Sequence, residues 1–111
     1  MVKGYIPERG DIIWISFNPQ VGKEQAGHRP ALVLSHKEYN KKVGLSILCP
    51  ITSKEKGYPF EVKINRKEIS GVVLADHVKN LDWSERKASF IAKAPEHVID
   101  EVITLINTII K

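Results

Sequence analysis

The chain has 111 residues, the length of one domain, and 42% of them are apolar, enough to form a hydrophobic core without metal ions or disulfides. A single cysteine excludes an intramolecular disulfide, and no apolar run is long enough to span a membrane. The first residues contain no apolar stretch of signal-peptide length, so we expect one cytoplasmic domain over residues 1–111.

The net charge of +4 is unevenly distributed along the chain. Residues 37–67 contain eight Lys or Arg and three Glu, whereas residues 95–111 contain one Lys and three acidic residues. A basic segment attracts phosphate groups or an acidic partner. A solvated, lysine-rich surface would give the same composition, so charge alone leaves both interpretations open.

Short strands separated by turn residues dominate the pattern. Runs rich in Ile, Val and aromatic residues predict strands at residues 10–17, 29–36, 45–52, 60–64, 71–76 and 88–94. Polar loops are expected at 18–27 and 53–59, and a short helical turn or loop at 37–44. Pro50 suggests that the third strand lies at a sheet edge or contains a bulge.

The apolar pattern also predicts which side chains lie in the core. In the fourth strand, Phe60, Val62 and Ile64 alternate with polar residues and should point inward. Trp14 and Cys49 lie within apolar strands and are expected to be core residues.

Residues 95–111 predict a helix. Pro95 suits a first helical turn, and Glu96 and Asp100 lie early, where the helix dipole favours acidic groups. The apolar residues extend beyond one face, and they are Val98, Ile99, Val102, Ile103, Leu105, Ile106, Ile109 and Ile110. Such a broad surface fits either burial in the core or contact with a second subunit. Short strands and a terminal helix together predict a mainly β fold, a small and strongly bent sheet or barrel.

The stretch EQAGHRPALVLS, residues 24–35, places polar groups directly before an apolar strand. Glu24, Gln25, His28 and Arg29 surround one glycine there. Such side chains are costly to bury without partners, so they form either a solvated loop or a site for a polar, anionic ligand.

Three segments resemble the MazF/PemK family of toxin endoribonucleases. They are GDIIWISFNPQVGKEQAGHRPALVLS (10–35), LCPITSKEKGYPFEV (48–62) and GVVLADHVKNLDW (71–83). The most specific feature is Gly-x-Glu-Gln-x-Gly-x-Arg-Pro before a strand, and the similarity runs from Gly10 to the last helix. Within the family, the chain looks closest to the MazF branch.

This resemblance implies an SH3-like, CcdB-type barrel that forms a homodimer. It also implies a sequence-specific endoribonuclease that cleaves single-stranded RNA without a metal ion. Toxins of this family are held inactive by a cognate antitoxin, whose acidic, disordered C-terminal segment wraps the toxin dimer.

The resemblance assigns catalysis to Arg29 and Thr52. An RNA-cleaving enzyme needs a cation at the scissile phosphate, a hydrogen-bond donor and a proton acceptor, because the ribose supplies the nucleophile. The planar guanidinium of Arg29 matches phosphate oxygens, although it would equally suit a structural ion pair. The Thr52 hydroxyl is a donor at a strand end, a position where threonine is also common for its β-propensity.

The identity of the proton acceptor is left open by the sequence. Glu24 and His28 are chemically suited to it, and either would alternatively orient Arg29 or contact a base. Asp76 lies where one branch of the family has its catalytic acid, but that branch has an Arg two residues earlier, where this chain has Leu74. We therefore assign Asp76 to RNA contact or dimer structure.

Several other residues are candidates for binding RNA. Tyr58 is the preferred base-stacking residue because it follows a glycine in a basic loop, whereas Phe17 and Trp83 are better explained as core or interface residues. His77 stands where MazF-like sequences usually have Gln, a difference expected to affect base recognition. Each lysine alone is also explained as solvated surface. The predicted RNA contacts are Phe17, Asn18, Gln25, Lys54, Lys56, Tyr58, Asp76, His77 and Lys79.

No metal or cofactor is expected, because the four histidines are scattered without a His-x-x-x-His pair. Two other functions stay open: a gyrase poison of the same fold, and a non-catalytic binding module. Gyrase poisons of that type end in Trp-Gly-Ile, whereas this chain ends in NTIIK. The residues do not reveal the RNA motif, for which an ACA-like trinucleotide follows only from closeness to the MazF branch.

Overall fold

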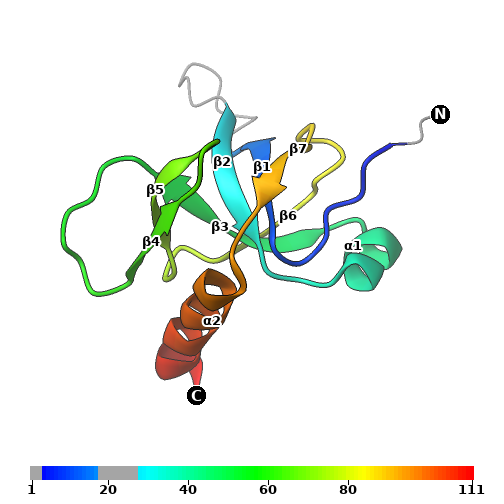
Figure 1. Cartoon of the computed structure of the whole chain (residues 1–111). Helices are drawn as coiled ribbons and strands as arrows, with labels where there is room; N and C mark the ends of the chain where they lie inside the picture. Colours follow the sequence, from blue (N-terminus) through cyan, green and yellow to red (C-terminus); the bar gives the residue numbers. More distant parts are fainter. Residues whose placement is uncertain (1–3, 18–27) are drawn as a thin grey trace.

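The computed structural model describes residues 4–17 and 28–111. Within them the elements follow in the order β1 (Asp11–Ser16), β2 (His28–Val33), α1 (Lys37–Val43), β3 (Ser46–Thr52), β4 (Glu61–Asn65), β5 (Ser70–Leu74), β6 (Lys79–Leu81), β7 (Ser89–Lys93) and α2 (Glu96–Ile110) (Figure 1). The six predicted strands and the terminal helix are confirmed, with boundaries that differ by at most three residues. The segment at 37–44 is a helix, and β6 is a strand that the sequence pattern did not predict, because three residues are too short for a periodic signal.

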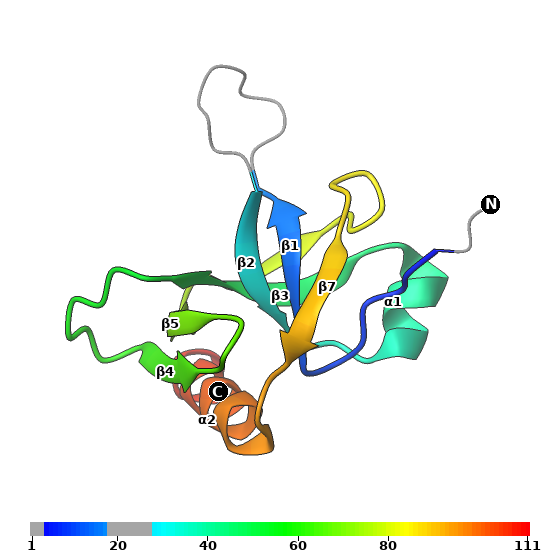
Figure 2. The same cartoon turned by 45° about the horizontal axis from the view of Figure 1, so that its top comes forward.

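The strands form one curled antiparallel sheet in the order β4-β5-β3-β2-β1-β7, and β6 pairs with β3 beside this path (Figure 2). Pro50 lies in the middle of this sheet, so the expectation of an edge strand is wrong. One side of β3 pairs with β2 at residues 48–50. The other side of β3 pairs with β6 at residues 46–48 and with β5 at residues 51–52. Pro50 thus falls where the second side of the strand changes partner.

The core has apolar side chains on both faces of the curled sheet. One cluster joins Ile12, Leu32 and Cys49 to Val98 of α2. The second cluster lies on the other face of β1 to β3 and consists of Ile13, Ile15, Ala31, Val33 and Leu48. Adjacent strand residues point to opposite faces, so β1 contributes to both clusters. The predictions for Cys49 and for the inward alternation of β4 are confirmed.

Trp14 was expected in the core, and this prediction is wrong, because 43% of its surface is exposed. It lies on β1 opposite Pro30 of β2 and Ser89 of β7. Helix α2 packs beside β4, towards the other end of the sheet order (Figure 1). An apolar strand residue is buried only where another layer covers it.

Helix α2 divides into a buried first half and an exposed last turn. Val98, Ile99 and Val102 are buried against the sheet, whereas Ile109 and Ile110 are 52% and 72% exposed. Core burial therefore accounts for the first half of the broad apolar surface, and the last turn is an uncovered apolar surface in the described chain. No helix of the described chain is long and apolar enough to cross a membrane.

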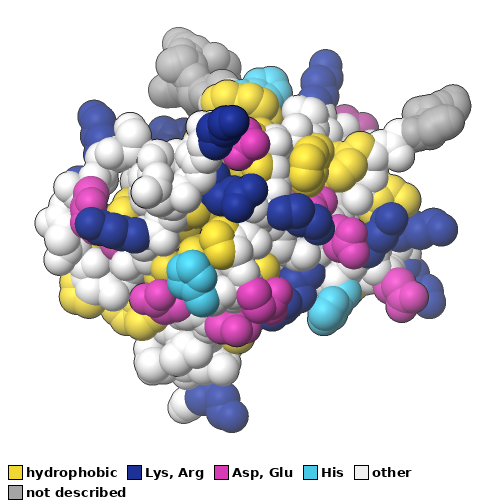
Figure 3. Space-filling view, viewed as in Figure 1, with side chains coloured by type: hydrophobic (Ala, Val, Ile, Leu, Met, Phe, Trp, Pro, Cys, Tyr) yellow, Lys and Arg dark blue, Asp and Glu magenta, His cyan; other side chains and the backbone are white. Residues whose placement is uncertain are grey.

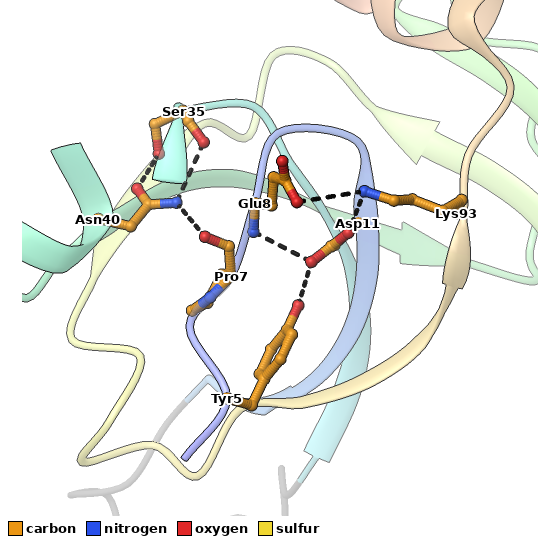
Figure 4. Close-up of polar contacts among 7 residues, drawn as sticks. All are labelled: Tyr5, Pro7, Glu8, Asp11, Ser35, Asn40 and Lys93. Carbon is orange, nitrogen blue, oxygen red and sulfur yellow. Dashed lines mark hydrogen bonds and ion pairs between the residues drawn. The ribbon is translucent and has the colours of Figure 1, made fainter. Parts of the chain in front are cut away.

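Two polar side chains are buried near the N-terminal segment and have partners (Figure 4). Asp11 accepts hydrogen bonds from the Tyr5 hydroxyl and from the Glu8 N–H, and its other oxygen lies 2.7 Å from Lys93 Nζ. Asn40 donates to the carbonyl of Pro7 at 2.8 Å and anchors this segment to α1. Satisfied partners are what make buried polar groups tolerable.

Basic and acidic side chains are interspersed over the face of the molecule shown in Figure 3. Arg9 lies 3.3 Å from Glu96 and 3.9 Å from Asp100, so the acidic start of α2 is partly neutralised within the chain.

Candidate functional site

The pairing register of β2 and β3 brings Arg29 close to Thr52. Ala31 pairs with Pro50, and Leu32 pairs with Cys49. Arg29 and Thr52 each lie two residues beyond the Ala31–Pro50 pair, and both line the same two hollows in the surface. Residues 23 positions apart in the sequence thus lie side by side because two strands pair in this register.

One of these hollows has a volume of about 330 Å³ and is lined mainly by polar and charged side chains. Its walls come from β2, the end of β3, the loop from residue 53 to 60, the start of β4 and the end of β5. In Figures 1 and 2 this loop extends outward from the sheet between β3 and β4. The lining residues are Arg29, Thr52, Lys54, Lys56, Tyr58, Glu61, Leu74 and His77.

Thr52 presents a hydroxyl group that still has a proton to donate. Its Oγ1 accepts a hydrogen bond from the Lys54 N–H at 3.2 Å, which leaves the hydroxyl hydrogen available. Gly71 of β5 holds the backbone of Thr52 in place from the other side. A Cβ atom at Gly71 would lie 2.3 Å from the Thr52 carbonyl oxygen, so only glycine permits this close approach.

Three cations face the hollow, and the described structure leaves them available to an anion. Arg29, Lys54 and Lys56 are exposed, and no ion pair within 4 Å involves any of them in the described part of the chain. Positive side chains around a concave surface attract phosphate groups.

Glu61, the first residue of β4, carries the negative charge at this hollow. Its carboxylate accepts hydrogen bonds from three consecutive backbone N–H groups, those of Lys56, Gly57 and Tyr58, at 3.0, 3.0 and 3.2 Å. The bond from Lys56 is the main cause that lowers the pKa of Glu61 below its ordinary value, and the other two bonds act in the same direction. The carboxylate is therefore ionised at neutral pH.

Tyr58 is held by Asp76, which follows β5. The Tyr58 hydroxyl donates to Asp76 Oδ2 at 2.5 Å, and this hydrogen bond raises the pKa of Tyr58. The second oxygen, Oδ1, is buried without a hydrogen-bond partner in the described structure and lies 3.9 Å from His77 Nε2. Asp76 thus positions one side wall of the hollow.

The other predicted site residues are distributed as follows. His28 is exposed at the start of β2, next to Arg29. Lys79 begins β6 and does not line the hollow, and Phe17 packs against the second core cluster, as does Trp83. Asn18, Glu24 and Gln25 lie outside the described residues.

Sequence reasoning missed Glu61 and Leu74 as lining residues. A charged residue at an outward strand position and a leucine in an apolar strand are both common, so neither carries a local signal. Over residues 4–17 and 28–111, no group of three or more His, Cys, Asp or Glu is arranged to hold a metal ion.

Comparison with known proteins identifies the family. Residues 8–110 match the family model described as "PemK-like, MazF-like toxin of type II toxin-antitoxin system". The chain belongs to the PemK/MazF toxin family. This membership confirms the resemblance seen in the sequence and, with it, the expectation of a toxin endoribonuclease.

Individual relatives agree with this assignment. The chain is 52% identical over 89 residues to the endoribonuclease toxin MazF of Escherichia coli K12, covering 80% of each chain. It is 33% identical over 117 residues to the endoribonuclease toxin ChpB of the same organism, covering both chains fully.

The fold is likewise that of solved MazF structures. A MazE–MazF complex from Deinococcus radiodurans superposes with a TM-score of 0.90 at 48% identity, covering 96% of this chain and 97% of that chain. MazF alone from the same organism gives a TM-score of 0.88 at 48% identity, with 96% and 98% coverage. The predicted MazF-type barrel with a C-terminal helix is therefore confirmed.

Proposed function

We propose that this MazF-like chain cleaves single-stranded RNA at a short sequence motif, with the scissile phosphate held between Arg29 and Thr52. The observation that carries the proposal is their side-by-side placement in one hollow together with Lys54 and Lys56. A phosphodiester chain is an anionic ligand that such a hollow suits.

The chemistry requires no metal ion. The ribose 2′-oxygen attacks phosphorus, the bond from phosphorus to the 5′-oxygen breaks, and the products are a 2′,3′-cyclic phosphate and a 5′-hydroxyl end. Arg29 stabilises the charge that develops on the phosphorane oxygens, and Thr52 donates a hydrogen bond to the same group. Glu24 and His28 are the candidates for accepting the 2′-hydroxyl proton and for returning a proton to the leaving oxygen.

Substrate recognition falls to the walls of the hollow. Tyr58, fixed by Asp76, presents a ring on which a base can stack. His77 and Lys56 line the same space and provide hydrogen-bond donors to bases or phosphates. Further contacts are proposed for Phe17, Asn18, Gln25, Lys54, Asp76 and Lys79.

We infer that the chain acts as one cytoplasmic toxin domain, forms a homodimer and is inhibited by an acidic antitoxin segment. Solved relatives include MazE–MazF complexes. The exposed apolar end of α2, at Ile109 and Ile110, is a surface suited to contact with another chain.

The test is cleavage of a long single-stranded RNA by the purified protein in EDTA, with every new 5′ end mapped. Recurrent cuts at one motif are expected, and Arg29→Ala should slow them by roughly 100- to 1,000-fold without changing Tm, because a transition-state contact is lost. Lys41→Ala, which removes an exposed cation from α1 outside the hollow, is the matched control. Intact RNA with the wild-type protein, or full activity of Arg29→Ala, would overturn the proposal.

A further inference from the structure

The loop between β3 and β4 has little packing to hold its shape. Residues 53–59 are exposed, so apolar burial contributes little to their order. The loop nevertheless supplies Lys54, Lys56 and Tyr58 to the hollow. The arrangement of these groups therefore depends on contacts other than core packing.

The carboxylate of Glu61 is placed to do this. Oε2 accepts from the Lys56 N–H at 3.0 Å, and Oε1 accepts from the N–H groups of Gly57 and Tyr58 at 3.0 and 3.2 Å. Three consecutive N–H groups that converge on one anion form a backbone nest, and Gly57, with φ +78°, provides the left-handed conformation that this requires. The Tyr58–Asp76 bond ties the same turn to the end of β5.

We propose that Glu61 is a positioning residue for RNA binding, whose carboxylate holds the 56–58 turn so that Lys56 and Tyr58 face the hollow in their binding arrangement. The inference rests on the proposed function. Glu61 has no bond to Arg29 or Thr52 in the described structure, so its role is in binding rather than in the chemical step.

The negative charge of Glu61 allows two effects on RNA binding to be told apart, namely ordering of the 56–58 turn and electrostatic repulsion. A carboxylate beside an anion-binding hollow repels RNA, so neutralising it should strengthen binding if charge were its only contribution. If Glu61 instead orders the turn, its neutralisation should weaken binding. The two explanations predict changes of opposite sign.

The experiment compares Glu61→Gln with Glu55→Gln on an oligoribonucleotide carrying the motif found by end mapping. Glu55 is a matched control, because it lies in the loop between β3 and β4 and its substitution removes the same charge. Its one ion pair in the described structure is with exposed Lys63 at 3.4 Å. For Glu61→Gln we expect KM to rise roughly tenfold with kcat within about twofold, because charge-assisted bonds that order the turn are lost. For Glu55→Gln we expect KM unchanged or lower.

Backbone amide signals of residues 56–58 provide a second readout that does not depend on catalysis. In the wild type these amides should exchange slowly with solvent and shift when Glu61 titrates at acidic pH. In Glu61→Gln at unchanged Tm the pH-dependent shift should vanish and the protection should weaken, because Gln carries no charge and keeps only one acceptor oxygen for the three N–H groups. Glu61→Asp, which keeps the charge on a shorter side chain, should restore part of the protection and part of the KM.

The outcomes are distinguishable. If wild type and Glu55→Gln cleave RNA and Glu61→Gln has the same KM as Glu55→Gln, the positioning role is wrong and the proposed function stands. A fall in kcat at unchanged KM would also overturn it. If the wild-type protein cuts no RNA, the proposed function fails and this inference fails with it.

Discussion

Two carboxylates of this protein each bind several donor groups, in different surroundings. Asp11, only 3% exposed, accepts bonds from Tyr5 and the Glu8 N–H and pairs with Lys93 (Figure 4). Glu61, at the partly exposed start of β4, accepts three N–H bonds from a solvent-exposed turn. The Asp11 network joins the N-terminal segment to β1 and β7, whereas the Glu61 network shapes a hollow that lies open to a ligand. The comparison teaches that burial decides whether a carboxylate network serves mainly stability or mainly the site.

The largest expected effect is a loss of stability at Gly71, which lies next to Thr52 of the candidate site. Gly71→Ala places a Cβ 2.3 Å from the Thr52 carbonyl oxygen and imposes a side chain at φ +154°. We expect a loss of roughly 3–5 kcal/mol in unfolding free energy from overpacking and backbone strain. Denaturant titration measures it.

Gly44→Ala is the control for this prediction. Gly44 also has a positive φ, +81°, but no atom of the described structure lies within 4 Å of the place that an added Cβ would occupy. Its substitution should cost about 1 kcal/mol, from conformational strain alone. Equal losses at the two glycines would show that contact with Thr52 is not important.

Asp11→Ala should reduce the unfolding free energy by about 3 kcal/mol, because it leaves the Tyr5 hydroxyl and the Glu8 N–H without their acceptor. Glu8→Ala removes a half-exposed carboxylate 3.8 Å from the same Lys93 and should cost less than about 1 kcal/mol. RNA cleavage per folded molecule should be unchanged in both variants. A stable Asp11→Ala protein would contradict the assignment of this network to stability.

The Asp11 network also predicts loss of stability at alkaline pH. Burial, and then the hydrogen bond to Asp11, raise the pKa of Tyr5 above its ordinary value of 10, so the stabilising contribution is complete below pH 10 and disappears as pH rises further. The bond to Asp11 raises the pKa of Lys93 as well, so the stability from this pair is also lost as pH rises. Tm should fall as pH rises above about 10, by several degrees more in the wild type than in Tyr5→Phe. Identical pH profiles would contradict the prediction.

The smallest stability effect is expected at Tyr58. Tyr58→Phe removes the hydrogen bond to Asp76 but keeps the ring, and the side chain is 44% exposed, so Tm should change by less than about 2 °C. KM for RNA should rise by about two- to threefold because the ring is less well positioned. A loss of stability as large as that of Asp11→Ala would remove the distinction between the two networks.

Local sequence patterns were sufficient for six of the seven strands in the described chain and for the terminal helix. Period-two alternation at Phe60, Val62 and Ile64 and the apolar spacing from Val98 onward reflect geometry within one strand or one helix, so they are legible without tertiary structure. Burial of Trp14 was predicted wrongly because it depends on whether another layer covers that end of β1. Strand β6 was missed because its pairing with β3, not its composition, creates it.

For the candidate site, the sequence determined which chemical groups are present. They are Arg29 within the family motif, Thr52 at a strand end and a basic loop that contains Tyr58. Only the tertiary structure decided that these groups share one hollow, because antiparallel register fixes which distant residues become neighbours. The same applies to Glu61, whose importance lies in three N–H groups that converge on it from a neighbouring turn. Side-chain identity is a local property, whereas convergence is a property of the folded chain.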